Sequence, residues 1–292
     1  MRTMTRPLPR RLTLISSQPA SPKPAEDPVW LELRREAEQA LTGAPQLASL
    51  FIGAVLNRSS LEEAVLFRIA SRLRNDLVSL ALLSEIFNRV VVADPGIGQA
   101  IRADLAAVVD RDPATERFIE PFLYFKGFHA IQTHRLAHWL WRNGERDLAL
   151  YLQSRSSDVF QTDIHPAARF GQGIFLDHAT GLVVGETAVV EDDVSLLQDV
   201  TLGGTGKESG ERHPKIRKGT MIGAGAKILG NIDVGPHARI AAGSVVLRPV
   251  GAFATVAGIP ARVIRVEPET ADHRSKDTIL KGLAYEAFEY SI

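Results

Sequence analysis

Two short polar stretches in the second half of this 292-residue chain hold residue types that can move a proton. Asp163 and His165 form the first stretch, and Asp177 and His178 form the second. An imidazole accepts a proton near neutral pH, and a carboxylate on its other ring nitrogen fixes the tautomer and stabilises the imidazolium. A lone histidine is more often a plain surface residue, so only the stretches taken together indicate general-base chemistry.

A third polar segment, GGTGKESGERHP from Gly203 to Pro214, ends with Arg212 and His213. A guanidinium group matches the planar geometry of a carboxylate. The GGTGK part is not a nucleotide-hydrolysing phosphate loop, because the glycine required five residues before the Gly-Lys pair is absent and no Ser or Thr follows Lys207. The remaining interpretation is a glycine-rich backbone that approaches a ligand closely.

Aliphatic and aromatic residues recur every six positions around these polar stretches. The three series are Ile164, Phe170, Leu176 and Leu182; then, after a two-residue slip, Val184, Val190, Leu196 and Leu202; and finally Ile216, Ile222, Ile228, Val234, Ile240 and Val246. One hexad cannot bury its apolar residue alone, so such repeats stack into a solenoid. The pattern predicts a parallel β-helix in which each hexad forms one short strand and a turn.

The polar stretches interrupt this repeat. Leu202 and Ile216 are fourteen positions apart, two more than a multiple of six, and the segment between them has no inward aliphatic residue. We therefore predict a loop that projects from the coil. Asp163 and His178 are fifteen residues apart, close to the roughly eighteen residues of a three-sided coil. This spacing predicts that they lie on adjacent coils, where the carboxylate can orient the imidazole.

Helical periodicity covers residues 28–158 and predicts six to eight helices. Ser60 followed by Glu63 has the spacing of a capping box. Asp94 followed by Pro95 predicts an N-cap with proline at the first helical position.

His134 and His138 lie four residues apart, on one face of a predicted helix. Metalloprotease helices use this spacing, but they require glutamate after the first histidine, where Arg135 stands. We therefore interpret the two histidines as packing or interface residues.

Composition excludes several classes of function. The 34 basic and 34 acidic residues cancel, so no basic field would recruit nucleic acid or an anionic membrane. No apolar run approaches the roughly 20 residues of a membrane span. Cysteine is absent, which excludes a disulfide or a thiolate nucleophile and agrees with a cytoplasmic location. Residues 1–27 are basic and proline-rich; they are predicted to be a disordered leader, with organelle import through residues 1–25 as the alternative.

Eight stretches together resemble the serine O-acetyltransferase family, over about Glu32 to Val266. They are ADPGIGQAIRADL, RDPA, YFKGFHAIQTHRLAHWLW, DIHPAA, LDHATGLVVGETAVV, DVTLGGTGK, RHPKIRKGTMIGAGAKILGN and AGIPARV. Other hexapeptide-repeat acyltransferases share the solenoid but not the helical part. The expected fold is α+β: an all-α domain over residues 28–160, a left-handed parallel β-helix over residues 161–266, and a flexible tail over residues 267–292.

The resemblance implies direct transfer of an acetyl group from acetyl-CoA to the L-serine hydroxyl in cysteine biosynthesis. Acetyl-CoA is then a co-substrate, and neither a resident cofactor nor a metal is expected. His178 would be the general base and Asp163 its orienting partner. Backbone N–H groups of Gly203 and Gly204, or the imidazole of His213, would stabilise the oxyanion.

The resemblance also assigns binding roles. Asp112 and Asp177 would hold the serine amine, while Arg212 and His213 would hold its carboxylate. The residues expected to contact CoA are Gly203, Gly204, Thr205, Lys218, Gly223, Ala224 and Lys227.

The same resemblance predicts partners. It implies a homotrimer or a dimer of trimers, with active sites between neighbouring subunits. L-Cysteine, the end product of the pathway, is expected to compete with serine. The C-terminal Ile292 is expected to insert into the active site of O-acetylserine sulfhydrylase.

Three other functions are alternatives for this sequence pattern. A sugar or homoserine O-acetyltransferase of the same solenoid would keep the His178 base. A zinc lyase would use His165, His178 and His213 as metal ligands. A scaffold that only binds the sulfhydrylase would need none of the catalytic groups.

Overall fold

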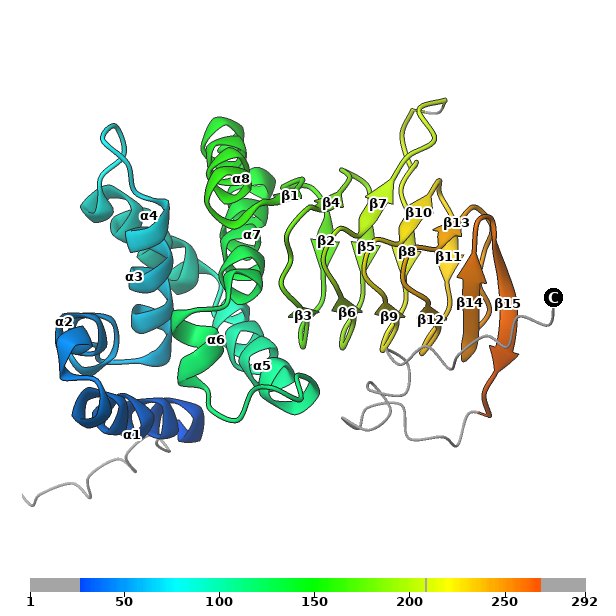
Figure 1. The fold of residues 1–292 in the computed structure, drawn as a ribbon. Helices are drawn as coiled ribbons and strands as arrows, with labels where there is room; N and C mark the ends of the chain where they lie inside the picture. Colours follow the sequence, from blue (N-terminus) through cyan, green and yellow to red (C-terminus); the bar gives the residue numbers. More distant parts are fainter. Residues whose placement is uncertain (1–26, 208, 269–292) are drawn as a thin grey trace, which may run out of the picture.

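The structure is a computed structural model that describes residues 27–207 and 209–268. A helical domain forms one end of the described chain, and a solenoid of short strands forms the other (Figure 1). The last helix ends at Phe160 and the first strand begins at Thr162. The predicted α+β class is confirmed. The predictions for the leader, for the tail beyond residue 268 and for Ile292 lie outside the described residues.

Eight α-helices occur among the described residues, in agreement with the predicted six to eight. They are α1 (Pro28–Gly43), α2 (Ala48–Phe51), α3 (Leu61–Leu73), α4 (Leu80–Ala93), α5 (Gly96–Arg111), α6 (Ile119–Leu123), α7 (Lys126–Arg142) and α8 (Arg146–Phe160), together with a 3₁₀ turn η1 (Pro45–Leu47) and a π turn η2 (Ile52–Leu56).

The predicted helix starts are correct in place but differ in detail. Ser60 Oγ accepts a hydrogen bond from the backbone N–H of Glu63, at 3.2 Å. The Glu63 carboxylate reaches back to the N–H of Ser59, at 2.8 Å, rather than to that of Ser60. Asp94 Oδ1 accepts from the N–H of Gly96, at 3.0 Å, and α5 begins at Gly96, one residue later than expected because Pro95 takes the capping position.

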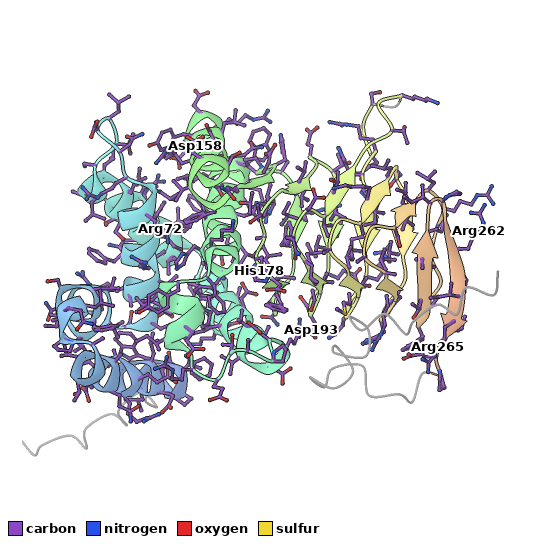
Figure 2. The ribbon with its side chains drawn as sticks, viewed as in Figure 1. Arg72, Asp158, His178, Asp193, Arg262 and Arg265 are labelled. Atoms are coloured by element: carbon purple, nitrogen blue, oxygen red, sulfur yellow. The ribbon has the colours of Figure 1, made fainter. Side chains whose placement is uncertain are left out.

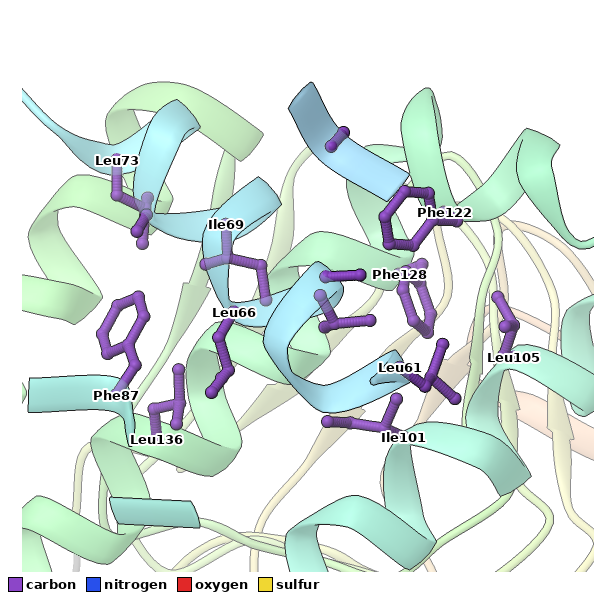
Figure 3. Close-up of a cluster of buried hydrophobic side chains, with 14 of the residues drawn as sticks. Leu61, Leu66, Ile69, Leu73, Phe87, Ile101, Leu105, Phe122, Phe128 and Leu136 are labelled. Carbon is purple, nitrogen blue, oxygen red and sulfur yellow. The ribbon is translucent and has the colours of Figure 1, made fainter. Parts of the chain in front are cut away.

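Large apolar side chains fill the centre of the helical domain (Figure 3). Phe87 and Phe122 are fully buried, and Phe128 is 2% exposed. Leu61 of α3 and Ile101 of α5 belong to the same cluster. This packing fixes the ends of α5 and α7, which face the solenoid.

The strands form three parallel sheets, which are the three sides of the coil. They are β1 (Thr162–Ile164), β2 (Arg169–Phe170), β3 (Phe175–Leu176), β4 (Leu182–Val184), β5 (Val189–Val190), β6 (Ser195–Leu196), β7 (Thr201–Gly203), β8 (Lys215–Ile216), β9 (Met221–Ile222), β10 (Lys227–Leu229), β11 (Asp233–Val234), β12 (Arg239–Ile240), β13 (Val245–Val246), β14 (Ala254–Gly258) and β15 (Ala261–Val266). Sheet 1 is β1-β4-β7-β10-β13, sheet 2 is β2-β5-β8-β11, and sheet 3 is β3-β6-β9-β12-β14-β15, where only β15 pairs antiparallel.

Turns join the sheets along three edges of the coil, which we call the 1–2, 2–3 and 3–1 edges. The predicted apolar residues face inward and stack between coils: Val190 pairs in register with Ile216, and Leu196 with Ile222. Leu196, Ile216 and Ile222 are fully buried. The periodicity of six therefore does specify the parallel β-helix.

The length of each coil shows where the regular repeat is broken. Val183 pairs with Thr201, eighteen residues later, as a regular coil requires. Asp163 pairs with Val183, which is twenty residues later, so two residues are added. They lie in the turn between β3 and β4, and the placement of the slip between Leu182 and Val184 was therefore wrong. Thr201 pairs with Lys227, twenty-six residues later. The eight extra residues lie in the loop between β7 and β8, which projects as predicted (Figure 1).

The two histidines of α7 join the helical domain to the first coil. The His134 ring bonds to the Ala168 carbonyl at 3.1 Å through Nε2, and the His138 ring bonds to the Pro166 carbonyl at 2.8 Å through Nδ1. Their interpretation as interface residues is confirmed.

Within residues 27–207 and 209–268, no helix combines the length and apolar character needed to cross a bilayer.

Candidate active site

His178 stands in the enlarged turn on the 3–1 edge, where the solenoid meets the helical domain (Figure 2). Its side chain is 73% exposed, whereas that of Asp177 is 27% exposed. His178 Nε2 lies 3.7 Å from Asp177 Oδ1. The turn therefore exposes the His178 imidazole to a substrate, next to the half-buried Asp177 carboxylate.

Asp112, at the end of α5, adds a second carboxylate to this edge. Its negative charge and that of Asp177 interact: burial raises the pKa of the Asp177 carboxyl, Asp112 raises it further, and His178 opposes both. Asp112 is held by two donors, the Thr115 hydroxyl at 2.6 Å and the Ala114 N–H at 2.9 Å. Two carboxylates beside one imidazole form a site that favours a cation such as an ammonium group.

A different group of polar residues lies on the 1–2 edge, around His213. The backbone N–H of Thr187 donates to His213 Nδ1, at 3.2 Å. In a neutral imidazole the proton is therefore on Nε2, which is left to donate a hydrogen bond. Burial, followed by the nearby Arg212 charge, lowers the pKa of His213 and favours the neutral ring.

Gly185 makes room for the His213 ring. A Cβ on Gly185 would lie 2.0 Å from His213 Nε2, so a larger residue would displace the ring. Glycine is thus required here by the close approach of a side chain that can donate to an anion.

Arg212 completes the group on the 1–2 edge. Its guanidinium donates to Glu186 Oε2 at 2.7 Å, and this hydrogen bond lowers the pKa of the Glu186 carboxyl. The Arg212 side chain is 31% exposed, so its unused donors remain open to a carboxylate from solution.

His165 lies near this second group, because the charges of Glu186 and Arg212 act on it. Asp163 lies beside the middle of β4. Asp163 Oδ1 accepts from Gln153 Nε2 at 2.6 Å, and its register partner on the next coil is Val183. No hydrogen bond or ion pair joins Asp163 to His178 among the residues that the structure describes. The His165 ring packs edge-on against Trp141, with centroids 5.1 Å apart, and burial lowers its pKa.

The two groups lie at opposite ends of β4. His178 precedes this strand, and Gly185, which contacts His213, follows it. A three-residue strand is about 10 Å long. Among the described residues, no hydrogen bond or ion pair joins the two groups.

The residues predicted to contact CoA are spread over all three edges. Gly203, Gly204 and Thr205 lead into the loop of the 1–2 edge, Gly223 and Ala224 lie on the 3–1 edge, and Lys218 lies on the 2–3 edge, 3.6 Å from Asp193 Oδ2.

Two of these residues already have structural partners. Lys227 Nζ lies 2.9 Å from Asp199 Oδ1. A Cβ on Gly223 would lie 2.7 Å from the N of Ala242, so the stacking of coils explains this glycine without a ligand.

Three residues of the two groups were not predicted from the sequence: Lys126, Glu186 and Thr187. Thr187 fixes the His213 tautomer, Glu186 binds Arg212, and Lys126 contacts Thr180 in the His178 turn. The position of Lys126 before Gly127 in YFKGFH is the one sequence feature that could have drawn attention to it. Nothing in the spacing of the sequence connects residue 126 with residue 178.

The zinc arrangement is not assembled within one chain. His178 lies on the 3–1 edge, whereas His165 and His213 lie near the 1–2 edge. In the described ranges, no group of three or more His, Cys, Asp or Glu residues is placed to hold a metal ion.

A helical domain followed by a three-sided hexapeptide coil with an exposed imidazole defines a hexapeptide-repeat transferase. The family model "Bacterial transferase hexapeptide (six repeats)" matches residues 213–248. The model "Serine acetyltransferase, N-terminal" matches residues 29–133. The chain is 49% identical to the serine acetyltransferase of Salmonella typhimurium strain LT2 over 262 residues, which are 90% of this chain and 96% of that protein. The chain belongs to the serine acetyltransferase family.

Solved structures agree with this assignment. The serine acetyltransferase of Brucella abortus strain S19 in complex with coenzyme A is 61% identical, with a TM-score of 0.82, over 83% of this chain and 97% of that one. The serine acetyltransferase of Neisseria gonorrhoeae in complex with serine is 47% identical, with a TM-score of 0.79, over 82% and 98% of the two chains.

Proposed function

We propose that this protein transfers the acetyl group of acetyl-CoA to the hydroxyl of L-serine. The observation that carries the proposal is the group formed by Asp112, Asp177 and His178 on the 3–1 edge, in a chain of the serine acetyltransferase family. The group supplies an anionic site for an ammonium and a base within reach of the hydroxyl on the same molecule. Acetyl-CoA is the co-substrate, and the scheme requires no resident cofactor.

The reaction follows from the position of the imidazole. His178 takes the proton of the serine hydroxyl while its oxygen attacks the thioester carbon. The new C–O bond gives a tetrahedral oxyanion, which collapses by breaking the C–S bond. The imidazolium then returns the proton to the departing CoA thiolate. The N–H groups of Gly203 and Gly204 are the proposed donors to the oxyanion, each worth about 3 kcal/mol. The Nε2–H of His213 is the alternative donor, in which case Arg212 alone would hold the carboxylate.

Substrate binding requires a second subunit in this scheme. Asp112 and Asp177 hold the ammonium, and Arg212 and His213 hold the carboxylate, but the two pairs lie on different edges of one chain. A trimer that packs the 3–1 edge of one subunit against the 1–2 edge of its neighbour would unite them. Asp163 is exposed on sheet 1 and makes no hydrogen bond or ion pair with His178 among the described residues. In this scheme it would act on His178 of a neighbouring subunit.

Other partners belong to the same proposal. L-Cysteine differs from serine only in a thiol for the hydroxyl, so the same charged groups would bind it as an inhibitor. CoA would lie between subunits along sheet 1, beside Thr205, Gly223, Ala224 and Lys227. Lys218 lies on another edge and would have to reach a distant part of CoA. Pairing of trimers, a cytoplasmic location and binding of the sulfhydrylase through Ile292 remain predictions.

The deciding experiment is thiol release from acetyl-CoA, with L-serine, L-homoserine or a sugar as acceptor. We expect release that depends on serine and that falls about 10²–10⁴-fold in His178→Ala. Arg217→Met is a matched control, because it removes an exposed cation that pairs with Glu191 and Asp233. Faster release with homoserine or a sugar would replace the proposed acceptor. Full activity of His178→Ala would remove the proposed base.

A further inference from the structure

The turn that presents His178 has an unusual backbone. His178 and the following Ala179 have φ values of 53° and 58°, in the left-handed region that side chains other than glycine rarely adopt. By register with the next coil, Gly181 corresponds to Asp199, which has a φ of 56°. A regular coil has one left-handed residue at this turn, so His178 and Ala179 are two more. The backbone of each is strained unless neighbouring contacts maintain the conformation.

Lys126, the first residue of α7, supplies such contacts. Its ammonium donates to Gln161 Oε1 at 3.0 Å and to the Thr180 hydroxyl. The Gln161 carbonyl in turn accepts from the N–H of Gly181, at 2.9 Å. Lys126 thereby joins the start of α7 and the end of α8 to the turn that carries His178.

Gly127 brings Lys126 to this position. A Cβ on Gly127 would lie 2.0 Å from the Leu176 carbonyl oxygen, so α7 begins directly against β3. β3 continues into Asp177 and His178. The close approach fixes the distance between the Lys126 backbone and the turn, which leaves the flexible lysine side chain only a short span to bridge.

We propose that Lys126 is a positioning residue that holds the His178 turn in its reactive conformation. The inference rests on the proposed function, in which His178 is the base. The ammonium group contacts the segment after His178 and makes no hydrogen bond or ion pair with the imidazole among the described residues. Lys126 therefore acts on the orientation of the base and not on the affinity for either substrate.

Steady-state kinetics of three variants test this role. Lys126→Met keeps the aliphatic stem and removes both hydrogen bonds, and Thr180→Val removes one acceptor at equal volume. We expect kcat to fall about 10–100-fold in Lys126→Met, because a base displaced by about 1 Å loses that much, while KM for serine and acetyl-CoA stays within about threefold. Lys126→Arg keeps a cation with several donors and should recover most of kcat. Arg217→Met again serves as the control.

A double variant adds a readout that a merely structural role would not move. If the two residues act through one hydrogen bond, Lys126→Met combined with Thr180→Val is no slower than Lys126→Met alone. If the fold-losses in kcat of the two single variants multiply in the double variant, the two residues act independently, and the proposed role of their hydrogen bond is wrong. If Lys126→Met does not fold, the kcat values of Thr180→Val and Lys126→Arg decide.

The outcomes separate this inference from the proposed function. A wild type without serine-dependent release ends the proposed function. An active wild type, an inactive His178→Ala and a Lys126→Met with unchanged kcat would end only the inference. A raised KM for acetyl-CoA or serine at unchanged kcat would make Lys126 a substrate-binding residue instead.

Discussion

The Asp104 carboxylate of α5 and the Arg135 guanidinium of α7 form a buried ion pair, with Nη2 and Oδ2 2.7 Å apart and side chains 0% and 9% exposed. Asp104 Oδ1 also accepts from the N–H of Ile174 at 2.8 Å, and Arg135 donates to the Gly171 carbonyl at 2.8 Å. The pair therefore joins two helices to the first coil. The ion pair therefore helps to fix the position of Asp112, which follows α5, and of Lys126, which begins α7.

Removing one member of this pair should strongly destabilise the protein. Arg135→Leu leaves the Asp104 carboxylate buried beside an apolar side chain, at a cost of about 3–5 kcal/mol. Urea unfolding at fixed protein concentration would measure this loss. The double variant Asp104→Leu with Arg135→Leu should recover part of it, because no charge then stays buried without a partner. Equal stability of Arg135→Leu and wild type would show that the pair contributes nothing to the junction.

Asp112→Asn should weaken serine binding with little effect on acetyl-CoA. The amide keeps the size of the side chain and loses the charge that attracts the ammonium group. A hydrogen bond to a charged group contributes about 1.5–3 kcal/mol, so KM for serine should rise about 10–100-fold. KM for acetyl-CoA is the internal control. An equal rise in both constants would indicate a disturbed fold and not a lost ammonium partner.

The buried His129 makes stability dependent on pH. Burial lowers the pKa of this histidine from 6.5 to about 3, and its Nε2 bonds to the Phe122 carbonyl at 2.8 Å. Because the folded pKa lies below that of the unfolded chain, the unfolded state gains a proton first as the pH falls. The resulting stability is complete above pH 6.5 and is lost progressively as the pH falls towards 3.

His129→Gln removes this titration and keeps a side chain that can donate to the Phe122 carbonyl. Between pH 7.5 and pH 5 the wild type should lose about 2 kcal/mol more unfolding free energy than the variant. Urea titrations of both proteins at the two pH values would measure the difference. The contributions of the other histidines to the pH dependence are the same in both proteins and cancel. Equal losses of unfolding free energy in the two proteins would show that the folded pKa of His129 is not lowered.

The fold was predictable because its cause is local. A residue such as Ile216 or Ile222 must be buried on a coil of fixed length, and this requirement places an apolar residue at every sixth position of the sequence. The two places where the repeat fails are also visible, and they hold His178 and His213. The exact position of the first failure was not predictable, because Leu182 and Val184 are both apolar and both buried.

The arrangement of the candidate site was less predictable, because it depends on which edge each residue occupies. The spacing of fifteen between Asp163 and His178 indicated neighbours, but the first coil has twenty residues and puts Val183 beside Asp163. Lys126 reaches Thr180 across 54 residues through the packing of α7 on β3. Such contacts between domains leave no periodic trace in a single sequence.

The separation of Asp177 and His178 from Arg212 and His213 leads to a mixing experiment. His178→Ala and Arg212→Ala should each be inactive when pure. If each site takes its base from one subunit and its guanidinium from the next, equal co-refolding of the two variants restores both wild-type residues in about a quarter of the sites. We therefore expect about a quarter of wild-type thiol release, with mixing of already folded oligomers as the control that stays inactive. A co-refolded mixture without activity would place both groups in one chain's site, which requires sheet 1 to rearrange so that the two ends of β4 approach the same serine.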